Sequence, residues 1–268
     1  MSAGKHNAAT ENASNLFMLL KNFGLILFTN IYNCYYIYNQ ILINFAPKVK
    51  IYNILYIHGM GGGEDSRIPS ILNEHIGEYL SPESDIRIDI IVRTYDIDPD
   101  IAEKQIAAWR QELNPELVIG ESLGSLHAIR IDGVPHLFVS PATGAARWMA
   151  LASYLPGAAW FMRTKFQPRP GKRQPLNFTR DILRHYRGMR EKVLSHSPSR
   201  GGKDYFFAFF GTKDTYRRWG VVNVRSWRKH FGRNTYAIYE GTHYMEEEFL
   251  HSMLIPKILE VLGLAGIS

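Results

Sequence analysis

The sequence predicts an α/β fold, with a mostly parallel sheet of about six strands and helices on both faces. Short apolar runs alternate with segments of ten to fifteen residues whose apolar positions recur at helical spacing. Strands that alternate with helices in this way form parallel sheets, because each connection places a helix over one face. The chain has 268 residues, 46% of them hydrophobic and 21% charged, which is enough to bury a full core.

The strand candidates are compact runs rich in Ile, Val, Tyr and Phe that end near glycine or polar residues. In chain order they lie at 50–59, 85–95, 116–120, 133–140, 204–211 and 234–241. The amphipathic segments between and after them predict helices at 67–80, 100–113, 123–131, 180–194 and 249–264. Asp65 or Ser66 is placed to cap the first of these helices.

Residues 1–48 differ in composition from residues 49–268, where we expect the folded domain. Eight asparagines fall within residues 1–46, against six in the remaining 222, and no charged side chain occurs in the 26 residues between Lys21 and Lys48. That length suffices to cross a bilayer, although buried amides are costly in lipid. This composition leaves three alternatives for residues 1–48: an appendage, a membrane anchor through residues 16–46, or an arm that packs on the domain.

The stretch "ELVIGESLGSLHAIRID" (116–132) combines a strand, a tight turn and a helix. Gly120 and Gly124 allow a sharp corner that carries Ser122 in a strained conformation at the start of a helix. This arrangement is typical of a nucleophile elbow. Ser122 is therefore the candidate nucleophile.

A serine hydroxyl needs a base to take its proton, and the base needs a carboxylate to orient it. Asp214 follows the expected strand at 204–211, and His243 follows the last expected strand. Serine, acid and histidine occur in the order required of a triad on this kind of sheet. The sequence predicts that Ser122, Asp214 and His243 act together.

A glycine-rich turn, "HGMGGG" (58–63), follows the first expected strand. Its backbone N–H groups can approach a bound oxygen closely, so we expect the N–H groups of Met60 and Leu123 to form an oxyanion hole. The turn lacks the GK[ST] of a phosphate-binding loop. His58 is expected to shape the turn.

HGMGGG, GESLG, GTKD and EGTHYM, in that order, resemble an α/β-hydrolase, and most closely the small bacterial esterases of the YqiA/YcfP type. The resemblance covers about residues 50–265 and implies a triad of Ser122, Asp214 and His243 with esterase-like activity. "VSPATGAARW" (139–148) resembles the NPA stretch of these esterases, with Ser140 in place of Asn.

The sequence departs from these esterases in two places. Ser125 stands where many of them have a second glycine, and the segment at about 145–203 is longer than a minimal member needs. We expect this segment to form a helical cap, with the apolar run at 148–162 as a lid that faces an acyl chain.

The cap segment is strongly basic. Residues 145–203 hold 13 Lys and Arg against two acids, whereas residues 64–116 hold 13 acids against five bases. A basic cap would attract anionic substrates through long-range electrostatics. The cations concerned are Arg163, Lys165, Arg169, Lys172 and Arg173. A solvated basic face without such a role is the alternative.

The sequence lacks the motifs that indicate a disulfide-linked protein, a metalloprotein or a nucleic-acid-binding protein. The one cysteine, Cys34, cannot form an internal disulfide, and no HExxH or Cys/His cluster indicates a metal. The acids of "DIDPD" (96–100) lack the glycine and glutamate of a calcium loop. No motif indicates a cofactor or nucleic-acid binding.

The sequence therefore predicts a serine hydrolase that cleaves a carboxylic ester or thioester, with a small acyl ester as substrate. A non-catalytic binding protein with the same fold and an acyltransferase are the alternatives, because an intact triad permits catalysis without proving it. We expect a cytoplasmic location, or membrane anchoring through the N-terminal segment.

Overall fold

The computed structural model describes residues 49–168, 171–195 and 205–265, together with Met18, Lys21, Tyr32, Asn33, Tyr35 and Tyr36. The chain divides into two units, Met1–Lys48 and Val49–Ser268. The role expected for residues 1–48 falls almost wholly outside the described residues, as does Arg169, and stays a prediction. Within the described part, no helix has the length and apolar character needed to cross a membrane.

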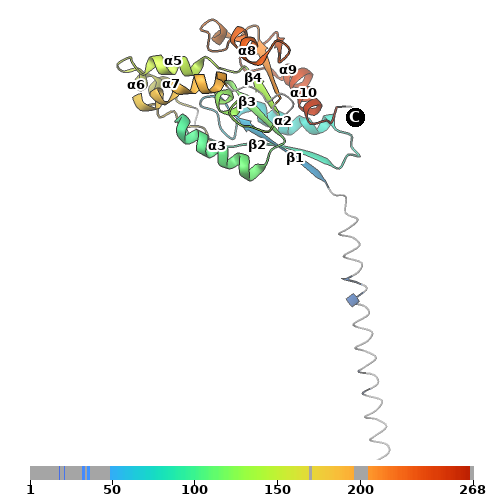
Figure 1. Cartoon of the computed structure of the whole chain (residues 1–268). Helices are drawn as coiled ribbons and strands as arrows, with labels where there is room; N and C mark the ends of the chain where they lie inside the picture. The colour runs from blue at the N-terminus through green and yellow to red at the C-terminus, as the bar shows by residue number, and fades with distance from the viewer. Residues whose placement is uncertain are drawn as a thin grey trace, which may run out of the picture. The chain divides into compact units, whose positions relative to one another are not determined.

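Six strands form one sheet in the unit Val49–Ser268 (Figure 1). They are β1 (Lys50–Ile57), β2 (Ile86–Val92), β3 (Leu117–Glu121), β4 (His136–Val139), β5 (Phe206–Gly211) and β6 (Tyr236–Tyr239). The strand order is β2-β1-β3-β4-β5-β6, and every neighbouring pair is parallel. The predicted sheet is thus confirmed.

Alternate residues of each strand pack on opposite faces of the sheet, as the two-residue period of a strand requires. Along β1, Ile54 and Tyr56 join one core cluster, whereas Leu55 and Ile57 join the other. The first cluster is covered by α2 (Arg67–His75), with the 3-10 turn η1 (Ile76–Tyr79), and by α9 (Glu247–Phe249), η4 (Leu250–Leu254) and α10 (Ile255–Val261). The second is covered by α3 (Pro99–Leu113), α4 (Ser125–Ala128), α5 (Ala145–Ala152), α7 (Arg180–Ser195) and α8 (Val224–Phe231).

Three helices differ from the prediction. The helix expected at 123–131 consists of the 3-10 turn η2 (Ser122–Gly124) and the four residues of α4, because the chain must return within a few residues to start β4. The C-terminal helix contains one π-helical turn, η4. Helix α8 was not expected, although Val224, Trp227 and Phe231 recur at helical spacing and pack on the core.

Ser66 precedes α2 at the N-cap position. It is one of the two residues, with Asp65, that we expected to cap this helix. Its hydroxyl does not bond an N–H of the helix but donates to the carbonyl oxygen of Gly63 at 2.7 Å. The capping residue therefore also ties the helix start to the glycine-rich turn.

The insertion between β4 and β5 carries α5, α6 (Ala158–Lys165) and α7, and we keep the name cap for it. That it covers the site stays a prediction, since α5 and α7 pack on one face of the sheet. The expectation that the run at 148–162 faces an acyl chain is wrong for most of its large side chains. Met149 is buried, but Trp148, Leu151 and Trp160 are exposed. The reason is that α5 has only one inward face, which Ala145, Ala146 and Met149 occupy.

Candidate active site

The loops after β1, β3, β5 and β6 meet at the carboxyl edge of the sheet. Strands β1 and β3 are neighbours, although β2 lies between them in the sequence and on the other side of β1 in space. Such a reversal of strand order opens a crevice at the sheet edge, where ligands of parallel sheets bind. The glycine-rich turn and Ser122 lie on the two sides of this crevice.

Ser122 has a φ of 48°, a left-handed conformation that is strained for a residue with a side chain. A Cβ atom at Gly120 would lie 2.7 Å from that of Ala128, and a side chain at Gly124 would collide with the carbonyl oxygens of Ile57 and His58. The Ser125 hydroxyl donates to the carbonyl oxygen of Gly120 at 3.1 Å. The two glycines therefore permit the close packing that holds the strained turn.

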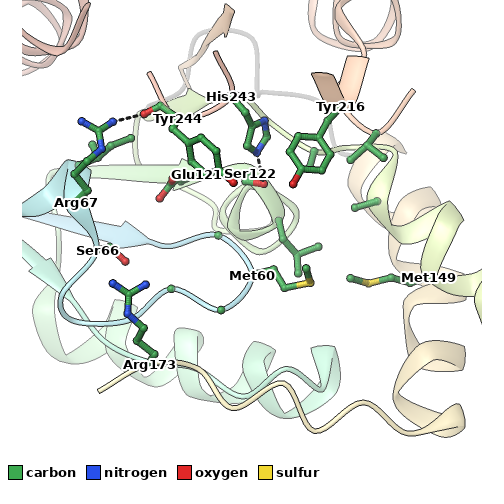
Figure 2. A pocket seen from close by; sticks show the side chains of 18 residues that line it. Met60, Ser66, Arg67, Glu121, Ser122, Met149, Arg173, Tyr216, His243 and Tyr244 are labelled. Carbon is green, nitrogen blue, oxygen red and sulfur yellow. Dashed lines mark hydrogen bonds between the residues drawn. The ribbon is translucent and has the colours of Figure 1, made fainter. Parts of the chain in front are cut away.

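Ser122, His243 and Asp214 form a continuous hydrogen-bonded chain (Figure 2 shows its first link). Ser122 Oγ lies 2.8 Å from His243 Nε2, and His243 Nδ1 lies 2.8 Å from Asp214 Oδ2. The other carboxylate oxygen of Asp214 accepts the backbone N–H of Tyr216 at 2.8 Å. Both the Asp214 and His243 side chains are buried, so this orientation is protected from water.

Met60 and Leu123 border the same pocket as Ser122. Leu123 is the second residue of η2, and the first N–H groups of a helical turn have no partner within it. The N–H of Met60 has no hydrogen-bond partner among the described residues. Met60 and Leu123 thus lie beside the candidate nucleophile, and the oxyanion hole expected from their N–H groups stays a prediction.

Gln174, which the sequence gave no reason to select, fixes the glycine-rich turn. Its backbone N–H donates to the carbonyl oxygen of Gly62 at 2.7 Å, and its Oε1 accepts the N–H of Gly61 at 3.0 Å. Its amide nitrogen donates to the carbonyl oxygen of Tyr95 at 3.2 Å, and the side chain is fully buried. The insertion between β4 and β5 therefore positions the turn that carries Met60.

Two buried histidines lie behind the site. The ring of His58 stacks on Tyr95 at 4.5 Å, and that of His127 meets Tyr95 edge-on at 5.0 Å. Burial lowers the pKa of His58 to about 4 and the pKa of His127 to about 3. Both are therefore neutral near pH 7 and serve as packed parts of the scaffold.

The pocket around Ser122 has a volume of about 610 Å³ and two unlike sides. Figure 2 shows Arg67 and Arg173 to one side of Ser122, and Met60 and Met149 to the other. Further apolar lining comes from Ile68, Leu123, Ala142, Ala145 and Val221. A substrate with one charged and one apolar end would match this arrangement.

Arg67 and Tyr216 are further pocket residues that sequence reasoning missed. Arg67, the first residue of α2, donates to the carbonyl oxygens of Tyr244 and Met245, just after His243. The ring of Tyr216 lies 4.5 Å from that of His243, and burial together with Tyr244 raises the pKa of Tyr216. Neither residue stands in a recognisable motif, because each reaches the site only through the fold.

Among the described residues, two groups of side chains have ligand atoms within 4.8 Å of one another and could hold a cation. They are His75, Glu247 and His251, and Asp98, Asp100 and His185. Neither group includes a residue that borders the pocket at Ser122. The triad therefore contains no side chain from either candidate cation site.

Comparison with known proteins bears on the fold. No protein-family model matches the chain, and no curated protein matches it either. Among solved structures, Est1E from Butyrivibrio proteoclasticus with bound ferulic acid is 13% identical, with a TM-score of 0.55, over 82% of this chain and 92% of that one. The chain has the α/β-hydrolase fold.

A monoacylglycerol lipase from Paleococcus ferrophilus is 14% identical over 81% of this chain and 95% of that one, with a TM-score of 0.47. The finer likeness to esterases of the YqiA/YcfP type stays a prediction. At these identities the similarity shows the fold alone. The function must therefore be inferred from the residues of the site.

Proposed function

We propose that the protein is a serine hydrolase that cleaves a carboxylic ester or thioester through an acyl-enzyme on Ser122. The observation that carries this proposal is the hydrogen-bonded chain from Ser122 through His243 to Asp214, with 2.8 Å at each link. The strained φ of Ser122 supports it, because strain of this kind is retained where function requires it.

In the first half of the reaction, His243 Nε2 takes the proton of Ser122 as its oxygen attacks the carbonyl carbon of the substrate. The N–H groups of Met60 and Leu123 donate to the resulting oxyanion, and such donors are each worth roughly 3 to 4 kcal/mol. His243 then gives its proton to the departing alcohol or thiol. Asp214 stabilises the protonated imidazole throughout.

In the second half, a water molecule gives a proton to His243 and attacks the acyl-enzyme. Collapse of the second tetrahedral intermediate releases the carboxylic acid and returns the proton to Ser122. The cycle needs no cofactor, because the same imidazole acts as base and acid in both halves.

The nucleophile is tested by Ser122→Ala. We expect ester hydrolysis to fall by roughly 10⁶-fold, as is typical when such a nucleophile is removed. Ser125→Ala is the matched control, because Ser125 lies three residues away and bonds only the carbonyl oxygen of Gly120. Hydrolysis of p-nitrophenyl acetate above a tenth of the wild-type rate in Ser122→Ala would show that another group reacts.

The substrate is proposed to carry a negative charge on its polar side. Arg67 borders the pocket and has no carboxylate partner among the described residues, whereas Arg173 pairs with Asp65 at 3.0 Å. Of the cap cations predicted to attract anions, Lys172 pairs with Glu64, and Arg163 and Lys165 lie on α6 outside the pocket lining. Arg67 and Arg173 border the pocket and thus support an anionic substrate more directly than Arg163, Lys165 and Lys172 do.

The charge preference is tested by comparing p-nitrophenyl hemisuccinate with a neutral ester of similar size. Added salt should lower kcat/KM for the charged ester only, since the Debye length shrinks from about 30 Å at 0.01 M to about 8 Å at 0.15 M. Arg173→Gln should lower kcat/KM for the charged ester about 2- to 5-fold and leave the neutral ester unchanged. Identical salt profiles for the two esters would exclude an anionic preference.

A further inference from the structure

Residues 148–166 of the cap expose seven large apolar side chains. Between 45% and 65% of the surface of each is accessible: Trp148, Leu151, Tyr154, Leu155, Trp160, Phe161 and Phe166. Trp219, which is 67% exposed, joins them because its carbonyl oxygen accepts the indole N–H of Trp148 at 2.8 Å. We call these eight side chains the cap face.

The members of the cap face are neighbours in space. Trp148, Leu151 and Trp219 border one shallow hollow, and Tyr154, Leu155 and Trp160 border another. Phe161 and Phe166 meet edge-on with ring centroids 6.5 Å apart. Large contiguous apolar patches are uncommon on soluble monomers and usually mark a binding surface.

Helix α6 shows most clearly that the cap face lacks a partner. It has eight residues, and none of them is buried. Helices this short are marginal in water and normally gain their stability from packing an apolar side. Ala159 and Met162 of α6 pack partly against the core, whereas Trp160 and Phe161 are 63% and 50% exposed, which leaves the aromatic side of the helix to another body.

The charge around the cap face indicates what that body is. Residues 145–173 contain six Lys and Arg and no Asp or Glu. Arg147, Arg163 and Lys165 are exposed, and none of the three forms an ion pair within the described part of the chain. Tryptophan, tyrosine and free cations together favour the interface of an anionic membrane, where rings enter the headgroup layer and cations meet lipid phosphates.

We propose that the cap face docks on an anionic lipid surface. Helix α5 links this surface to the pocket, because Trp148 and Leu151 lie outside while Met149 lines the cavity at Ser122 (Figure 2). Figure 1 shows α5 and α6 together at one end of the unit Val49–Ser268. The proposal does not depend on the proposed hydrolysis, and its test measures no turnover.

Tryptophan fluorescence of the full chain provides the test, with vesicles that contain brominated phospholipids as short-range quenchers. Residues 1–48 contain no tryptophan, so contact of that segment with lipid leaves the signal unchanged. Of the five tryptophans, Trp148, Trp160 and Trp219 belong to the cap face, and Trp227 is buried. We expect quenching on phosphatidylserine-containing vesicles and little on pure phosphatidylcholine.

Two double variants test the cations and the aromatic rings of α6 separately. Each cation near an anionic surface contributes about fivefold to binding, so Arg163→Gln with Lys165→Gln should weaken vesicle binding by about 30-fold. Trp160→Ala with Phe161→Ala should weaken it as well, without unfolding, since neither side chain is buried. Arg228→Gln with Lys229→Gln on α8 is the matched control and should bind as the wild type does.

Three results would overturn the proposal. The first is absence of quenching on phosphatidylserine vesicles, and the second is equal quenching on neutral vesicles. The third is a wild-type dimer that Trp160→Ala dissociates, as measured by light scattering, because a second copy of the chain would then cover the cap face.

Discussion

The triad loops and the cap differ in how their side chains are held. Ser122, His243 and Asp214 each have defined hydrogen-bond partners at the end of a strand, and Asp214 and His243 are buried. The cap, by contrast, exposes aromatic rings such as that of Trp160, which is 63% accessible to solvent. The sheet thus determines the geometry of the reaction site, whereas the outer side of the cap is not shaped by the core of this chain.

Asp214→Asn tests the buried region most severely. We expect kcat to fall about 10⁴-fold while the fold persists, because an amide no longer holds the required imidazole tautomer. Steady-state hydrolysis of p-nitrophenyl acetate measures kcat, and circular dichroism measures whether the fold persists. Glu240→Gln, at an exposed acid three residues before His243, is the control and should retain wild-type kcat. A loss below tenfold in Asp214→Asn would separate Asp214 from the triad.

Two tryptophans allow a direct comparison of core and cap. Trp227 is fully buried, so Trp227→Ala should lower the free energy of unfolding by about 3 to 5 kcal/mol. Trp160 is 63% exposed, and Trp160→Ala should change the free energy of unfolding by less than about 0.5 kcal/mol. Urea titrations of both variants provide the measurement. Equal losses would mean that the ring of Trp160 packs as closely as that of Trp227, which would contradict the contrast between cap and core.

The pH dependence of stability tests the buried scaffold behind the elbow. Since the pKa of His127 is about 3 when folded and near 6.5 when unfolded, the unfolded chain binds more protons below pH 6.5. Stability is therefore full above pH 6.5 and falls as the pH drops, by about 2 kcal/mol for this group at pH 5.

His127→Leu isolates this contribution. Between pH 7 and pH 5, the variant should lose about 2 kcal/mol less free energy of unfolding than the wild type. The remaining dependence should include His58, whose pKa is also lowered by burial. Parallel pH profiles of variant and wild type would show that His127 can take up a proton without unfolding.

The sequence predicted the sheet because its strands are buried on both sides and appear as continuous apolar runs. The site residues followed from the same pattern, since Ser122, Asp214 and His243 each come within four residues of the end of a strand. Arg67 and Gln174 were missed because they act through contacts made 79 to 178 residues away along the chain. No local pattern reports such contacts.

The cap shows a second limit of sequence reasoning. An apolar run such as 148–162 indicates that its side chains avoid water in some state, but not which surface they meet. The structure separates Met149, which lines the pocket, from Trp148 beside it, which is 45% exposed. Only the rotation of α5 about its axis makes this distinction, and tertiary packing determines that rotation.

The central claim is that Ser122 is a nucleophile activated by His243. Covalent labelling of the full chain with a fluorophosphonate, followed by peptide mass spectrometry, tests it most directly, because the probe reacts with activated serines. We predict one label per chain, on the peptide that contains Ser122, and strongly slowed labelling in His243→Ala. An unlabelled wild-type protein, or a label on a different serine, would contradict the account.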